Sequence, residues 1–71
     1  MKEHVVKMLQ THMEAQKAKG ELSLELLLSH PVGIGDHSTG DFYDNAVEAL
    51  KMIAEADDCL DTLRRYTDGQ I

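Results

Sequence analysis

The side chains best suited to bind a metal ion stand together in one glycine-containing stretch of this 71-residue chain, residues 30–41. His30 and His37 carry imidazole nitrogens, and Asp36 and Asp41 carry carboxylate oxygens, which are ligands for zinc and other divalent cations. Their spacing matches no recognised metal site, and a histidine beside a helix end is more often a cap or a turn residue. We rank a metal-dependent enzyme last, because no obvious base or nucleophile completes such a site.

The same stretch offers a second kind of chemistry, anion binding, because Gly33 and Gly35 precede the start of a helix. Glycines let a backbone approach a ligand closely, and the free N–H groups of a helix N-terminus attract phosphate. Against this, the stretch holds no lysine or arginine, and Asp36 and Asp41 would repel an anion. The resulting alternative hypothesis is an oligomeric sponge that sequesters a phosphate-bearing small molecule, such as a cyclic nucleotide signal. In the simpler interpretation, the glycines only allow a tight reversal of the chain.

The single cysteine, Cys59, is a poor candidate for a nucleophile. Its acidic neighbours Asp57, Asp58 and Asp61 favour a protonated thiol, whereas a reactive cysteine needs the thiolate. One cysteine also excludes a disulfide within the chain. We therefore predict that the protein is not an enzyme, with no catalytic residue, no metal and no cofactor.

Two helical patterns flank the glycine-containing stretch. The first covers about residues 3–29 and ends before Pro31, which cannot continue a helix. Gly20 interrupts it at a cost of about 1 kcal/mol relative to alanine, so it marks either a helix end or a bend where another backbone comes close. We favour continuation. Residues 22–28 could pass for a strand, but no second strand is available to pair with them.

The second helix is predicted over residues 41–66, after a loop over residues 30–40 and before a tail over residues 67–71. Its apolar residues follow alternating steps of four and three, which is typical of a seam that packs against a partner helix. The seam consists of Phe42, Ala46, Ala49, Ile53, Ala56, Leu60 and Leu63. Its three alanines would let two backbones approach closely. The sequence therefore predicts an all-α, single-domain antiparallel helical hairpin that oligomerises through an alanine-rich seam.

A second apolar stripe lies beside this seam on the same predicted helix. It consists of Tyr43, Val47, Leu50 and Ala54. Together the two stripes are wider than packing against one helix requires, and a chain this short has a marginal core of its own. We expect the remaining apolar surface to close in a homo-oligomer or on another protein. The alternative is that the helix sits deeper in a monomer.

Charge divides the chain into two unlike parts. Residues 1–20 hold four lysines against two glutamates, whereas residues 21–71 hold eleven acids against three bases, within a net charge of −6. This asymmetry favours antiparallel pairing of the two helices, and the negative balance argues against nucleic acid as a ligand.

No apolar run approaches the roughly 20 residues of a membrane span, and the N-terminus lacks a signal-peptide pattern. We expect a soluble, intracellular protein that does not bind membranes.

The stretch from Leu26 to Tyr66 resembles a family of small uncharacterised proteins of tailed bacteriophages. The resemblance is carried by Pro31-Val32-Gly33-Ile34-Gly35-Asp36-His37-Ser38 and by Ile53-Ala54-Glu55-Ala56-Asp57-Asp58. In that family a helical segment leads into a similar Pro-Val-Gly-Ile-Gly loop with an acid and a histidine, followed by an acidic helix. The resemblance implies a viral accessory or virion-associated protein, in the host cytoplasm or the virion, and brings no catalytic residues.

The leading functional hypothesis is a non-enzymatic phage protein that acts by self-assembly and by protein–protein interaction. Its partners would be further copies of itself and either a virion component or a host protein. The loop would serve as the recognition surface, through His30, Pro31, Val32, Gly33, Ile34, Gly35, Asp36 and His37. In the alternative, the sponge would sequester a host signal.

Overall fold

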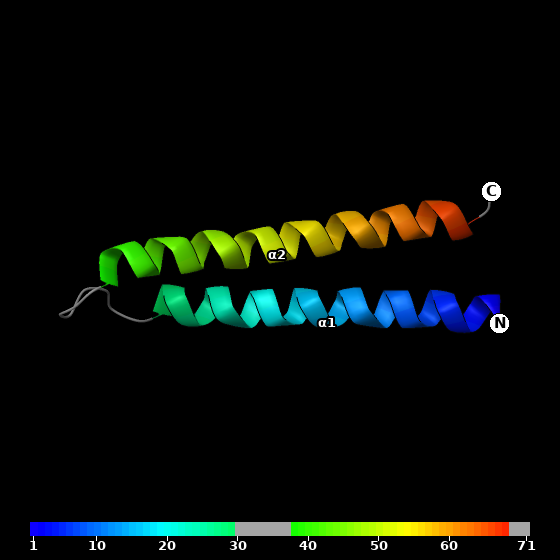
Figure 1. The fold of residues 1–71 in the computed structure, drawn as a ribbon, viewed down its shortest axis with the longest axis horizontal. Coiled ribbons are helices and arrows are strands. Elements are labelled where there is room, and N and C mark those ends of the chain that lie inside the picture. Colours follow the sequence, from blue (N-terminus) through cyan, green and yellow to red (C-terminus); the bar gives the residue numbers. More distant parts are fainter. Residues whose placement is uncertain (30–37, 69–71) are drawn as a thin grey trace.

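The computed structural model describes residues 1–29 and 38–68, which form two long helices. Helix α1 covers Lys2–Ser29 and helix α2 covers Ser38–Thr67. The helices lie side by side in opposite directions, so the start of α1 and the end of α2 lie at the same end of the hairpin (Figure 1). The predicted all-α antiparallel hairpin is confirmed.

Helix α1 continues without a break through Gly20 and through residues 22–28, which are helical and not a strand. Gly20 is the buried residue of this helix. A β-carbon built on it would lie 2.9 Å from Cγ1 of Ile53 and 3.1 Å from the carbonyl oxygen of Ala49. The glycine therefore sits where the backbone of α2 comes close, which is one of the two roles that the sequence left open.

Helix α2 begins at Ser38, three residues before the expected start near residue 41, and ends at Thr67, one residue beyond the expected end. The expected loop over residues 30–40 is correspondingly shorter. The sequence offers Ser38, Thr39 and Asp41 as candidate N-caps, and the expected start lies at the last of them, whereas the backbone is already helical at the preceding residues, including Gly40. Asp41 lies in the first turn, where its negative charge complements the helix dipole, and Arg64 and Arg65 lie in the last turn, where their positive charges do so.

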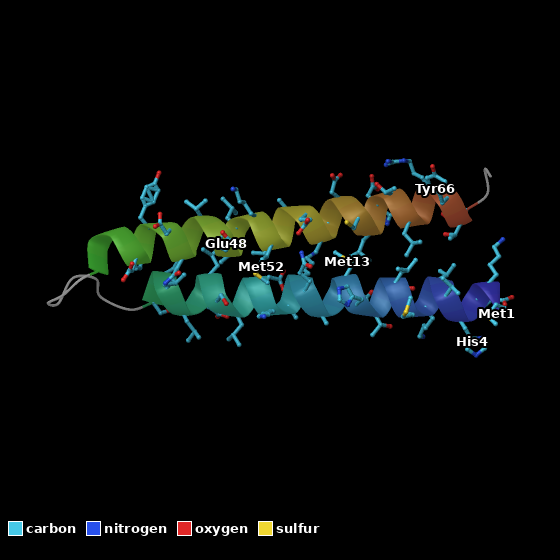
Figure 2. The ribbon with its side chains drawn as sticks, in the orientation of Figure 1. Met1, His4, Met13, Glu48, Met52 and Tyr66 are labelled. Carbon is cyan, nitrogen blue, oxygen red and sulfur yellow. The ribbon has the colours of Figure 1, made fainter. Side chains whose placement is uncertain are left out.

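The core of the hairpin is the alanine-rich seam of α2 packed against α1. Ala49 is 2% exposed and Ala56 is 0% exposed, and they are the buried apolar side chains of the described residues. The other five seam residues are half-buried. From α1, Met13 reaches into the space between the helices, and Met52 does so from α2 (Figure 2). The small residues Gly20, Ala49 and Ala56 thus allow the backbones of the two helices to approach closely. Longer side chains fill the space beside them.

The second apolar stripe stays open to solvent in the single chain. Tyr43 is 62% exposed, Leu50 is 58% exposed, and Val47 and Ala54 are exposed as well. The predicted exposed apolar surface is therefore present. The alternative, in which this helix is buried more deeply within a monomer, does not hold for the described residues.

Candidate interaction surface

The predicted recognition loop, residues 30–37, lies outside the described residues. The interpretations that depend on it are the protein-recognition surface, the anion-binding glycines and the metal ligands His30, Asp36 and His37. They stay predictions. Among the described residues, no group of three or more histidine, cysteine, aspartate or glutamate side chains is arranged to hold a metal ion.

Two neighbouring polar residues of α1, Gln16 and Lys17, contact α2 in the middle of the hairpin. Gln16 donates hydrogen bonds from Nε2 to the carbonyl oxygen of Met52, at 3.2 Å, and to Oε1 of Glu55, at 2.9 Å. The ammonium Nζ of Lys17 lies 2.8 Å from Oδ1 of Asp57. A basic α1 residue thus pairs with an acidic α2 residue, as the charge asymmetry favours. These contacts fix the alignment of the two helices along their length.

Replacing Asp57 with asparagine is expected to lower the melting temperature slightly at neutral pH. The hydrogen bond and charge of Asp57 raise the pKa of Lys17 above its ordinary value of 10.5, with a smaller contribution from Glu21. Because the folded pKa is the higher one, the stabilisation is complete below pH 10.5 and disappears as the pH rises through the folded pKa. Melting temperatures of both proteins, measured by circular dichroism from neutral to strongly alkaline pH, should converge at the alkaline end.

The matched control for this prediction is Asp58→Asn, since Asp58 is exposed and makes no ion pair with the described residues. It removes the same charge but should leave the melting temperature nearly unchanged. About 1 M salt should also erase the effect of Asp57→Asn, because the pair is half exposed and screened. Equal effects of the two variants would show that net charge, and not this contact, is responsible.

Helical spacing and the contacts across the seam divide the hairpin surface into two flanks. Gln16, Met52 and Glu55 lie on one of them, which we call the Cys59 flank. It is formed at steps of three and four residues by Leu9, His12, Gln16, Lys19, Ser23 and Leu26 of α1 and by Asn45, Glu48, Met52, Glu55, Cys59, Thr62 and Tyr66 of α2. The opposite side, around Lys17 and Asp57, is called the Lys17 flank.

The Cys59 flank is hollowed by an apolar groove of about 350 Å³ near the end that holds both termini. Leu9 and Met13 line it from α1, and Cys59 and Tyr66 line it from α2, together with Asp58, Thr62 and Leu63. Leu9 is 41% exposed and Tyr66 is 68% exposed. Tyr66 and Met1 lie at the same end of the hairpin in Figure 2. The groove is thus a preformed apolar recess on an open face.

Sequence reasoning missed the apolar surface of α1, because it attended to the stripe on α2. The first half of α1 exposes Val5 and Met8 as well as Leu9, at 44%, 56% and 41%. A signal was present: these residues and Val6 cover more of the helix circumference than contact with one partner helix can use. Only the helix pairing shows which of them turn toward α2 and which stay outside.

No protein-family model matches this chain, and the comparisons found no matching curated protein and no matching solved structure. Within the described residues, no helix is both long and apolar enough to span a membrane. What the fold and its surface define is a class of structure: a two-helix antiparallel hairpin with a thin core and open apolar flanks.

Proposed function

We propose that this protein is a non-catalytic interaction protein that self-associates and binds a protein partner. The observation that carries the proposal is the mismatch between core and surface. Two alanines form the buried apolar core of the described residues, whereas eleven large apolar side chains among those residues are exposed. Two helices alone cannot cover both flanks, and apolar patches of this kind on a small protein typically mark contacts with other proteins.

The alanine-rich seam of α2 packs against α1 of the same chain and is not available to another copy. Further copies therefore bind at the flanks. Ala49 and Ala56 are closed off by α1, and the apolar side chains left for a partner lie beside the seam. The association therefore completes a bundle that one chain only begins, which is a common way for helical hairpins to bury their apolar surface. Self-association also explains how so thin a core can maintain two helices of this length.

The partner class follows from the sequence resemblance to small phage proteins. Under this proposal the protein acts as a phage accessory or virion-associated protein, in the host cytoplasm or in the virion. The assembled hairpins present their loops, residues 30–37, to a virion component or a host protein.

Sedimentation or light scattering over a wide range of protein concentration tests the self-association. We expect the measured mass to rise from the 7.9 kDa of one chain to a whole multiple of it as concentration increases. A mass that stays at one chain even at high concentration would overturn the proposal. Thermal shifts with cyclic nucleotides in the same samples test the sponge alternative, because a ligand that binds the folded state stabilises it by mass action.

A further inference from the structure

We propose that the Cys59 flank is the surface on which a second copy of this chain docks, face to face, with a twofold axis along the hairpin. This inference rests on the proposed self-association and specifies its geometry. In this arrangement each α1 lies against α2 of the other copy, and the two ends that hold the termini coincide. The product is a four-helix bundle in which every pair of neighbouring helices is antiparallel.

The uncovered area is the right size for such a dimer. The chain exposes 5460 Å², whereas a folded monomer of its mass is expected to expose only about 4,400 Å². The surplus of about 1,000 Å² is close to the roughly 800 Å² that each partner buries in a stable protein–protein interface. A second copy that covers one flank would remove an area of this order from solvent.

The apolar groove favours this flank and this axis. Leu9, Met13, Cys59 and Tyr66 line it from both helices, and all lie toward the end that holds the termini. A twofold axis along the hairpin brings the groove of one copy against the groove of the other. An axis across the hairpin would instead place each groove over the loop end of its partner, and the two apolar recesses would not meet.

The charges on the Cys59 flank are complementary under the same axis. On this flank α1 carries Lys19 and no acid, while α2 carries Glu48, Glu55 and, at the groove, Asp58. Because Gly20 lies against Ala49, Lys19 and Glu48 stand at nearly the same height along the bundle. Figure 2 places Glu48 on α2 beside Met52. When α1 covers α2 of the other copy, Lys19 of each copy faces Glu48 of its partner. The dimer therefore contains two such contacts.

The Lys17 flank lacks this complementarity, although it carries the exposed stripe of α2. Glu14 lines a hollow there together with Val6 and Leu60, and Glu21 acts on the charge of Lys17 from the same side. Asp57, Asp61 and Arg64 line the adjoining hollow from α2, and Lys17 lines it from α1. Both helices thus present acids together with bases on this flank, so its charges do not distinguish α1 from α2 as those of the Cys59 flank do.

The alkylation rate of Cys59 in the unmodified protein reports directly on this surface, because Cys59 is exposed in the single chain and is its only thiol. We expect the rate to fall as protein concentration is raised through the range in which the mass doubles. An unchanged rate while the mass doubles would overturn the docking surface but leave self-association intact. A mass that never doubles would overturn the underlying proposal as well, so the two failures are distinguishable.

The two tyrosines of the chain provide a matched pair of variants. Tyr66→Ser removes an exposed ring from the Cys59 flank, and Tyr43→Ser removes an equally exposed ring, at 62% against 68%, from the other side. We expect Tyr66→Ser to weaken dimerisation about 30-fold, the range of an interface hot spot, and Tyr43→Ser to leave it nearly unchanged. Circular dichroism should show that both variants remain helical, and the reverse order of effects would contradict the proposal.

A charge exchange between copies tests the pairing of α1 with α2 of the partner. Lys19→Glu and Glu48→Lys should each weaken self-association about tenfold, because each creates like-charge pairs in the homodimer. Mixed in equal amounts, the two variants should form a heterodimer that restores association, with glutamate facing lysine at both contacts. If mixing restores nothing, the charges act within one chain, and the proposed geometry is wrong.

Discussion

Replacing Gly20 with leucine is expected to lower the free energy of unfolding of the hairpin by about 3 kcal/mol. Gly20 is buried, and even a β-carbon there would lie 2.9 Å from Cγ1 of Ile53 and 3.1 Å from the carbonyl oxygen of Ala49. That oxygen belongs to the backbone of α2 and cannot rotate away. A leucine must therefore push the helices apart, and this loss exceeds the roughly 1 kcal/mol that removing a glycine from a helix interior gains.

Thermal unfolding followed by circular dichroism measures this effect, with all proteins compared at one concentration because association also stabilises the fold. The helical signal itself should fall, since isolated helices of this kind are marginal in water. Gly20→Ala should be intermediate, as its single added carbon meets the same atoms. A leucine variant that melts at or above the wild-type temperature would disprove the close approach at this site.

The matched control is Gly40→Ala, because a β-carbon at Gly40 in the first turn of α2 would meet no atom within 4 Å. The same type of residue is replaced, but here only the conformational gain remains. We expect Gly40→Ala to stabilise the protein by about 0.5 kcal/mol. A loss of stability at Gly20 and a gain at Gly40 would distinguish the effect of helix packing from that of helix propensity.

Replacing Ala56 with leucine is the second large effect, an expected loss of about 2–3 kcal/mol. Ala56 is 0% exposed against α1, and Ala49, two helical turns earlier, is 2% exposed. The close approach of the helices at these alanines leaves no room for a larger side chain. The added apolar surface therefore cannot be buried without separating the backbones, and separation also strains the contacts of Gln16 and Lys17 with α2.

Urea unfolding compared with Ala18→Leu measures the effect of Ala56→Leu. Ala18 is exposed on α1, so the same atoms are added to a surface position with room for them. We expect the control to stay within about 0.5 kcal/mol of the wild type. Equal midpoints for the two leucine variants would mean that the seam is not closely packed at Ala56.

Residue periodicity alone was enough to predict the two helices and the face by which they meet. The steps of four and three from Phe42 to Leu63 can pack only as a helix seam, and every seam residue is buried or half-buried in the hairpin. Continuation of α1 through residues 22–28 also followed, because a lone strand has no partner for its backbone groups. The start of α2 was misplaced by three residues, since side-chain capping preferences do not fix the point where a backbone turns helical.

The tertiary structure alone decided the alignment of the helices and what it leaves open. Periodicity specifies a face of a helix but not its position along a neighbour, so no pattern predicted that Gly20 would meet Ala49 or that Lys17 would reach Asp57. The same pairing decides which apolar residues of α1 turn inward and which line the groove beside Cys59. A surface shared by two helices exists only once both are in place, and for that reason the candidate docking site could not be found from one helix at a time.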